Sequence, residues 1–306
     1  MEDLISVIMS TYNESVSELR ESIESVLKQT YSNIEFIIVI DNPNNEELSE
    51  FIYSFDDSRI RVIKNDRNIG LVNSLNKAIC QSKGEYLARM DADDISELYR
   101  MEHQKKYLEE NDFDLIGGIS QMIDEDGNTI YSIKKVPTNF KKIKKCIKYN
   151  QVISHPTWFG KKEVFDKLNG YRNMPLCEDY DFTLRAILQG FKISNVNECV
   201  LKYRMTKDSI SRSNLFEQYL FARYITKQYS EGKVSEVEEA KSYVKKNLSD
   251  KNAKHYLKGN ERFNNALNNL EEKQYIQFIA NGIALLFTSK YYLDKIFRFI
   301  MVYLNS

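Results

Sequence analysis

Residues 84–94 have the sequence Gly-Glu-Tyr-Leu-Ala-Arg-Met-Asp-Ala-Asp-Asp, in which a short apolar run leads directly into three carboxylates. The run 86–90 has the length and composition of a buried β-strand. Like charges at this spacing repel one another unless a cation lies among them. A hard, oxygen-liganded ion such as Mg²⁺ or Mn²⁺ would relieve the repulsion and leave positions for phosphate oxygens. The alternative is that Asp94 or Ser96 only caps the helix that follows.

Upstream of this stretch, short apolar runs alternate with amphipathic segments. The apolar runs predict strands at 5–9, 34–40, 60–64 and 86–90. Helical periodicity predicts helices at 19–27, 46–55 and 71–81. This alternation is typical of an α/β fold with a doubly wound, mostly parallel sheet and flanking helices. Downstream, we expect a helix at 97–110, a strand at 115–121 and a turn at 124–128.

Polar residues follow three of the predicted strands. Thr11, Tyr12 and Asn13 follow the first strand, Asp41 follows the second, and the acidic stretch follows the fourth. In doubly wound sheets, ligands bind beyond the carboxyl ends of the strands, so we expect these loops to form one site. No GxGxxG or GxxxxGKS/T motif follows the first strand. That absence argues against a dinucleotide dehydrogenase and a P-loop NTPase.

A second acidic group occurs at Glu178, Asp179 and Asp181, directly before a helix predicted at 182–188. Carboxylates at the start of a helix are commonly only partners of the helix dipole. Acids this close together, flanked by Cys177, also favour a raised carboxylate pKa, which suits a general base. Both interpretations stay open at the level of these residues.

His155 stands close to Trp158, the only tryptophan in the chain. With the proline between them, these residues predict a rigid aromatic wall against which sugar rings pack. His155 and Trp158 are therefore candidates for lining an acceptor site. The alternative for His155 is a hydrogen-bonded structural role. His103 and His255 lie in charged helical surroundings and are expected to be solvated.

Charge and cysteine usage limit the partners and the compartment. The 306 residues include 43 basic and 44 acidic side chains, a formal net charge of −1, so no global field attracts nucleic acid and none is expected as a partner. The four cysteines lack metal-ligand spacing, which favours reduced thiols in a cytosolic setting. The acidic N-terminus and its short apolar run do not resemble a signal peptide. A cytoplasmic location is expected.

The C-terminal part of the sequence differs in character. Near residue 213, long charged helical stretches begin, and we expect domains at 1–212 and 213–306. The segment 275–304 combines dense apolar content with scattered Lys and Arg, which is typical of helices on a membrane surface; a packed terminal helix pair fits it equally. No segment offers the roughly 20 consecutive apolar residues of a membrane-spanning helix. A peripheral position on the inner membrane face is expected.

These pieces, in this order, resemble glycosyltransferase family 2, a family of inverting enzymes with the GT-A fold. The likeness covers roughly residues 4–210. It is carried by the stretches 6–13, 25–31, 68–70, 84–94 and 178–179.

The resemblance implies a role for each candidate residue. Thr11 and Asp41 would contact the nucleotide base, Asp91 the ribose and diphosphate, and Asp93 a Mn²⁺ or Mg²⁺ ion. Tyr12, Asn13 and Ala92 would complete the nucleotide-sugar site. Asp179 would deprotonate the acceptor hydroxyl, with Glu178 supporting it. One departure is that Ile40-Asp41-Asn42-Pro43 stands where the family usually has two acids and a glycine, so that Asp41 matches only the second acid.

The expected function is inverting transfer of a hexose from a UDP-sugar to a lipid-linked acceptor sugar of bacterial O-antigen or capsule. Galactose is the preferred hexose, with glucose or N-acetylhexosamine behind it, and the helical tail favours an undecaprenyl-diphosphate carrier. A nucleotidyltransferase is an alternative, but it would need a glycine-rich, basic loop after the first strand, and residues 10–14 are neither. A catalytically silent scaffold is a further alternative, although a scaffold has no need of Glu178 and Asp179.

Overall fold

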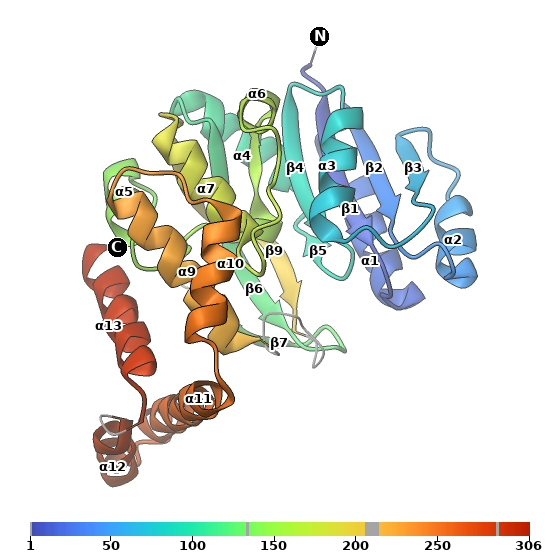
Figure 1. Ribbon diagram of the computed structural model, residues 1–306. Coiled ribbons are helices and arrows are strands. Elements are labelled where there is room, and N and C mark those ends of the chain that lie inside the picture. The colour runs from blue at the N-terminus through green and yellow to red at the C-terminus, as the bar shows by residue number, and fades with distance from the viewer. Residues whose placement is uncertain (1, 133–134, 206–213, 286–287) are drawn as a thin grey trace. The chain divides into compact units, whose positions relative to one another are not determined.

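The computed structural model describes residues 2–132, 135–205, 214–285 and 288–306 (Figure 1). The chain divides into two compact units. The sheet unit comprises Met1–Lys144, Gln151–Asn173 and Glu178–Lys207, and the helical unit comprises Lys145–Asn150, Met174–Cys177 and Asp208–Ser306. The domain boundary predicted at 212–213 lies outside the described residues.

The first half of the sheet is parallel. Its strands are β1 (Ile5–Thr11), β2 (Ile34–Ile40), β3 (Ile60–Lys64) and β4 (Tyr86–Asp91), in the order β3-β2-β1-β4. The connecting helices are α1 (Val16–Leu27), α2 (Glu46–Tyr53) and α3 (Leu71–Gln81). β2 is buried along its whole length, as expected for a strand covered on both faces. The strands and helices predicted for this half are confirmed, with small shifts at their ends.

The second half of the sheet mixes strand directions. β8 (Phe159–Lys161) pairs antiparallel with β4 and with β6 (Leu115–Ile123), and β6 pairs parallel with β9 (Ile193–Arg204). β5 (Ile95–Ser96) pairs with β9, and β7 (Thr129–Ser132) pairs with β6. The helices of this half are α4 (Arg100–Glu110), α5 (Phe140–Cys146), the 3₁₀ helix η1 (His155–Thr157), α6 (Lys162–Lys167) and α7 (Glu178–Leu188).

The segment after β4 differs from the sequence prediction. β5 pairs with β9, so the following helix begins later than expected, at Arg100, with Tyr99 as its N-cap residue. Asp94 is fully buried, and its carboxylate accepts a hydrogen bond from the backbone N–H of Arg204 at 2.9 Å. Neither Asp94 nor Ser96 caps α4, so the capping interpretation of the acidic stretch is wrong.

The helical unit contains α9 (Leu215–Ser230), α10 (Val237–Asn247), α11 (Asp250–Glu271), α12 (Tyr275–Leu285) and α13 (Lys290–Asn305). Its centre is aromatic, because the ring centroid of Tyr256 lies 5.1 Å from those of Phe216 and Tyr292. α12 and α13 also expose large apolar side chains, such as Ile276 and Tyr303. None of the described helices has the length and apolar content needed to cross a bilayer.

Candidate active site

The carboxyl ends of the central strands meet at one edge of the sheet. β1 lies between β2 and β4, and Ser10 of β1 aligns with Asp91 of β4. Beyond the end of β2, the backbone N–H of Asp41 donates to the carbonyl of Thr11 at 2.9 Å. The expectation that the polar loops after these strands converge is confirmed.

Glu14 holds the loop after β1. Its carboxylate accepts the Thr11 hydroxyl at 2.6 Å and the Tyr12 backbone N–H at 2.8 Å. The Asn13 side chain accepts a hydrogen bond from the amide of Asn42 at 2.7 Å. Thr11 is buried, whereas Tyr12 and Asn13 are exposed. Tyr12 and Asn13 are therefore the more accessible of the three predicted nucleotide contacts.

Asp41 is buried, and its carboxylate organises the turn before α3. One oxygen accepts hydrogen bonds from the Asn65 side-chain amide at 2.8 Å and the Ile69 backbone N–H at 2.9 Å. The other accepts the backbone N–H of Gly70 at 2.9 Å, where a φ of +83° suits glycine. Asp41 thus fixes the 65–70 loop, and its contact with a nucleotide base stays a prediction.

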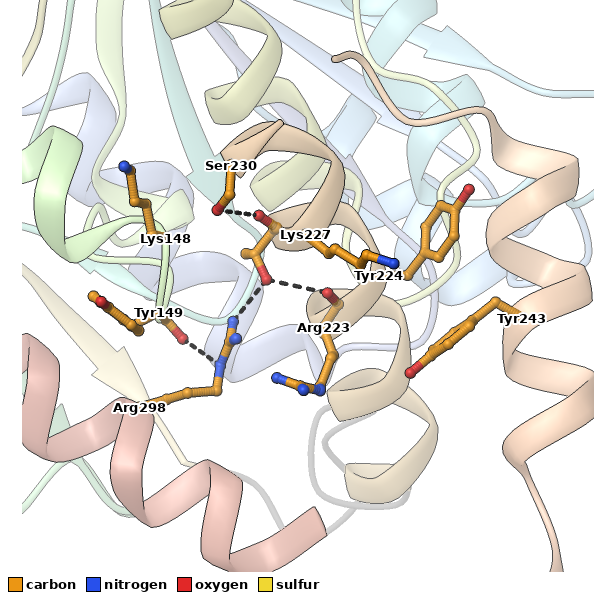
Figure 2. A pocket seen from close by; sticks show the side chains of 9 residues that line it. Lys148, Tyr149, Arg223, Tyr224, Lys227, Ser230, Tyr243 and Arg298 are labelled. Atoms are coloured by element: carbon orange, nitrogen blue, oxygen red, sulfur yellow. Dashed lines mark hydrogen bonds between the residues drawn. The ribbon is translucent and has the colours of Figure 1, made fainter. Parts of the chain in front are cut away.

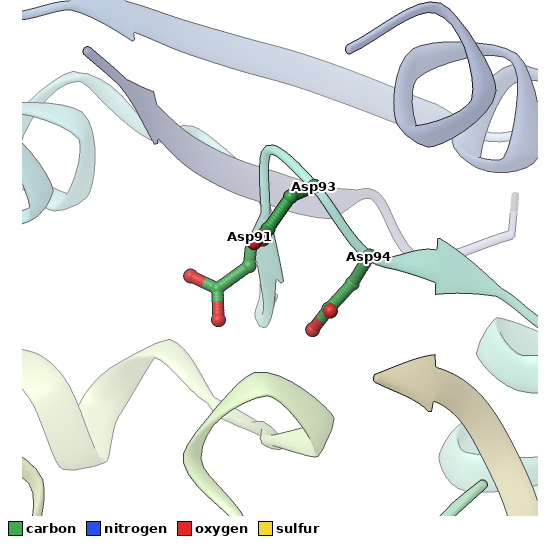
Figure 3. Close-up of side chains that lie close together, drawn as sticks. All are labelled: Asp91, Asp93 and Asp94. Carbon is green, nitrogen blue, oxygen red and sulfur yellow. The ribbon is translucent and has the colours of Figure 1, made fainter. Parts of the chain in front are cut away.

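Asp91, Asp93 and Asp94 form a compact acidic cluster (Figure 3). One carboxylate oxygen of each residue lies within 4.8 Å of the others. A two-point ion pair with Arg89 holds the Asp91 carboxylate. Asp94 Oδ2 is buried and has no hydrogen-bond partner among the described residues. Ala92 is buried between the acids and packs into the core.

Burial and mutual repulsion disfavour full ionisation of this cluster. Burial raises the pKa of Asp93 to about 7, with further contributions from the charges of Asp91 and Glu14. Burial also raises the pKa of Asp94 well above its ordinary range, and the charges of Asp91 and Asp93 add to the effect. An all-oxygen donor set and the unpartnered Asp94 oxygen fit a hard divalent cation such as Mg²⁺ or Mn²⁺.

Two buried arginines that the sequence analysis did not single out support the cluster. Arg204, at the end of β9, donates to the carbonyl of Asp93 at 2.9 Å and to that of Glu125 at 2.8 Å, and it pairs with Glu21. Arg89 is almost fully buried in β4 and pairs with the neighbouring Asp91. A lone arginine inside an apolar strand was a signal available in the sequence, because burying it requires a nearby carboxylate.

Glu178 and Asp179 occupy the first turn of α7, which begins before the predicted residue 182. Asp179 accepts the Tyr180 backbone N–H at 2.7 Å, and the Gln151 amide lies 3.4 Å from its other oxygen. Burial, together with the charge of Asp179, raises the pKa of Glu178 to about 7, and burial raises the pKa of Asp179 as well. The charge of Asp91 also contributes to the Glu178 pKa, so the two acidic groups share one electrostatic environment.

The third acid of this group, Asp181, is structural. It is buried and pairs with Arg172 and Arg185. Arg185 in turn donates to the carbonyls of Leu168 at 2.8 Å and Gly170 at 2.9 Å. These contacts fix the loop before α7, and with it the position of Glu178 and Asp179 at the helix start.

His155 and Trp158 belong to a buried aromatic cluster. The His155 Nε2 lies 2.8 Å from the Tyr171 hydroxyl, and the Trp158 ring packs against Phe182 with centroids 5.3 Å apart. Burial, with the nearby charge of Arg89, holds the pKa of His155 well below its ordinary range. Trp158 has no exposed surface, so a sugar ring cannot stack on it. The expectation that Trp158 lines an acceptor site is corrected, and the hydrogen-bonded structural alternative describes His155.

Comparisons with known proteins agree with this architecture. The glycosyltransferase WbnJ of O-antigen biosynthesis in Escherichia coli is 33% identical over 232 residues, which cover 74% of this chain and 89% of that protein. A glycosyltransferase of Methanocaldococcus jannaschii is 40% identical over 233 residues, covering 75% and 80%. The crystal structure of S. aureus TarS 1–349 in complex with UDP-GlcNAc superposes with a TM-score of 0.59 at 18% identity, covering 78% of this chain and 70% of that one.

The structural likeness concerns the fold alone at this identity, and it confirms the predicted GT-A fold. Residues 6–168, more than half of the chain, match the family model for glycosyl transferase family 2. With relatives above 30% identity over about three quarters of its length, the chain belongs to glycosyltransferase family 2.

Proposed function

We propose that this glycosyltransferase moves a hexose from a UDP-sugar to a lipid-linked acceptor sugar, with inversion at the anomeric carbon and dependence on a divalent metal. One observation carries the proposal: the cluster Asp91, Asp93 and Asp94 lies at the same sheet edge as the loops that follow β1 and β2, and the charge of Asp91 contributes to the raised pKa of Glu178. Galactose is our first choice of hexose, with glucose or N-acetylhexosamine next. TarS, which shares the fold, was crystallised with UDP-GlcNAc, which supports a UDP-sugar donor.

The donor-side residues bind and orient the nucleotide sugar. Tyr12 and Asn13 offer exposed groups to the nucleotide, and Asp41 sets the loop beside them. Asp93 and Asp94 would hold the divalent ion, which would supply positive charge to the departing diphosphate. Arg89 keeps the Asp91 carboxylate in a fixed orientation, which suits recognition of a ribose hydroxyl.

The acceptor-side residues handle one proton. Asp179 takes the proton of the acceptor hydroxyl at a carboxylate oxygen as the acceptor oxygen bonds to the anomeric carbon and the bond to the diphosphate breaks. Glu178 raises the proton affinity of Asp179 through its adjacent negative charge. A single displacement inverts the anomeric carbon and needs no covalent nucleophile.

The acceptor and its location complete the proposal. WbnJ takes part in O-antigen biosynthesis, which supports a surface-polysaccharide acceptor, and undecaprenyl diphosphate is our proposed carrier for it. The exposed apolar side chains of α12 and α13 support a peripheral position on the inner face of the cell membrane.

A panel of UDP-sugars with Mn²⁺ and a synthetic lipid-diphosphate sugar acceptor tests the proposal through UDP release. We expect Asp93→Asn and Asp179→Asn to lower acceptor-dependent release by roughly 10²-fold or more. Asp126→Asn, at an exposed turn position, serves as the matched control and keeps full activity. Full turnover by both site variants would overturn the mechanism.

The same assay separates the alternative functions. Pyrophosphate release from a nucleoside triphosphate and a sugar phosphate would point to a nucleotidyltransferase. UDP binding without metal dependence, together with no transfer to any acceptor, would point to a silent binding scaffold.

A further inference from the structure

The helical unit contains a cavity of about 530 Å³ that the proposed reaction does not use. It is bounded by α9, α10, α13 and the segment 145–150 (Figure 2). Four cationic side chains line it: Lys148, Arg223, Lys227 and Arg298. Among the described residues, no acidic side chain lines it. Positive charge therefore concentrates here in a chain whose formal net charge is only −1.

Two hydrogen bonds fix the guanidinium of Arg298 at the wall of the cavity. Its Nε donates to the carbonyl of Tyr149 at 2.8 Å, and its Nη2 donates to the Thr226 hydroxyl at 2.8 Å. Within the described part of the chain, its Nη1 makes no hydrogen bond. The guanidinium plane is thus fixed while donors remain for a ligand, which is the arrangement that recognises phosphate oxygens.

The other three cationic side chains differ in whether a carboxylate neutralises their charge. Arg223 pairs with Asp294 at 2.9 Å, which partly neutralises it. Lys148 and Lys227 are exposed and have no ion-pair partner in the ranges that the structure describes. With Arg298, these two lysines leave about three positive charges without a counter-charge in contact with them.

Three tyrosines also line the cavity, together with Thr226 and Ser230. Figure 2 shows Tyr149 on one side of the cavity and Tyr224 and Tyr243 on the other. The Tyr224 and Tyr243 ring centroids lie 5.4 Å apart, and the Tyr224 hydroxyl donates to Glu239 at 2.7 Å. Such rings accommodate the carbon portion of a ligand whose charged end meets the cations.

We propose that this cavity is a binding site for a phosphate or diphosphate group, with Arg298, Lys148 and Lys227 as its main contacts. The ligand is either the headgroup of an anionic lipid or a soluble phosphate compound, since both present the same oxygens. The site is formed within the helical unit alone, so it stands whether or not the proposed sugar transfer holds.

Calorimetry with inorganic pyrophosphate tests the site directly. The titration contains EDTA, which removes divalent metal and so prevents metal-bridged binding at the acidic cluster. The double variant Lys148→Ala/Lys227→Ala should bind pyrophosphate roughly tenfold more weakly than the wild type. Both lysines are exposed and lack protein partners, so the variant should fold normally, which circular dichroism checks. The control Lys254→Ala/Lys258→Ala removes the same charge from the exposed surface of α11 and should bind as the wild type does.

Vesicle sedimentation distinguishes the two sources of the phosphate. The probes are phosphatidylcholine vesicles with and without phosphatidylglycerol. Loss of the phosphatidylglycerol-dependent fraction only in the Lys148/Lys227 variant identifies a lipid headgroup, whereas lysine-dependent pyrophosphate binding without that loss identifies a soluble ligand. If the two double variants behave alike with both pyrophosphate and vesicles, the proposed site is wrong.

Discussion

Among single residues, Glu178 and Asp179 show most directly how environment sets chemistry. Both stand at a helix start, where the dipole lowers a carboxylate pKa, yet burial wins and raises the pKa of Glu178 to about 7. The sequence predicted a base with a raised pKa at this point, from the closeness of the acids and the flanking Cys177, but it did not show how deeply the two carboxylates are buried. It also gave no reason to single out Arg204, because its contacts come from segments far apart in the chain.

The pH dependence of transfer follows from these two acids. The proposed base, Asp179, acts only when deprotonated, and burial raises its pKa, so kcat/KM should rise with pH at a higher pH than an ordinary aspartate would give. Glu178→Gln removes a like charge and should lower the pKa of Asp179, which shifts the rise to lower pH. Profiles of UDP release between about pH 5 and 9 measure the shift. An unshifted profile in the variant would separate Glu178 from the base.

The burial of Glu178 also makes the folding stability depend on pH, and this stability falls with rising pH whereas the activity rises. Because the Glu178 pKa is raised from 4.5 to about 7 in the folded protein, the folded state binds more protons than the unfolded state across that interval. The associated stability is present at low pH and is lost as pH rises through about 7. The free energy of unfolding of Glu178→Gln, compared with that of the wild type, should therefore rise as the pH is raised from about 5 to about 8. Urea denaturation at both pH values measures this, with exposed Glu110→Gln as the control.

Helices and strands whose apolar residues recur with a clear period, or form a continuous run, could be predicted from the sequence. The shortest strands could not. The parallel strands carry continuous apolar runs, and α3 begins and ends where its periodicity predicts. β5 and β8 are too short to show any period. They form because β9 and the neighbouring strands supply their hydrogen bonds. The start of α4 was misplaced for this reason.

Arg204 joins the end of β9 to the segment after β4, and its replacement tests that connection. Arg204→Lys keeps the charge but loses the planar fork that contacts Asp93, Glu125 and Glu21 at once. We expect a loss of about 2 kcal/mol in unfolding free energy and weaker Mn²⁺ activation of UDP release. Urea denaturation and a Mn²⁺ titration measure the two effects. Arg67→Lys, at an exposed position, is the matched control and should change neither quantity.

At the scale of the whole molecule, the two units carry different chemistry. The sheet unit holds the acidic cluster and the predicted base, whereas the helical unit holds the cationic cavity and the exposed apolar helices. The sequence indicated a change of character near residue 213, but 145–150 and 174–177 also belong to the helical unit. These two segments belong to the helical unit because of contacts between residues far apart in the chain, such as the hydrogen bond from Arg298 to the Tyr149 carbonyl. The local sequence carries no signal for such contacts.

The proposed membrane association concerns the whole molecule, and substitutions in α12 can test it. Ile276, Ile279 and Ile283 recur at helical spacing and are 81%, 56% and 56% exposed, so they form one apolar stripe. Burying an isoleucine in the lipid interface contributes roughly 1.5–3 kcal/mol, and Ile276→Lys/Ile279→Lys should weaken partition to neutral phosphatidylcholine vesicles by roughly 100-fold or more.

The matched control for this stripe is Gln277→Lys, which adds positive charge to the same helix at an exposed position off the stripe. It should partition as the wild type does, because phosphatidylcholine vesicles carry no net charge for the new lysine to meet. UDP release with a soluble acceptor should stay unchanged in every variant, since the acidic cluster and the proposed base belong to the sheet unit. Equal partition of the stripe variant and the wild type would show that α12 does not contact the membrane, and the peripheral location would then have to rest on the cationic cavity alone.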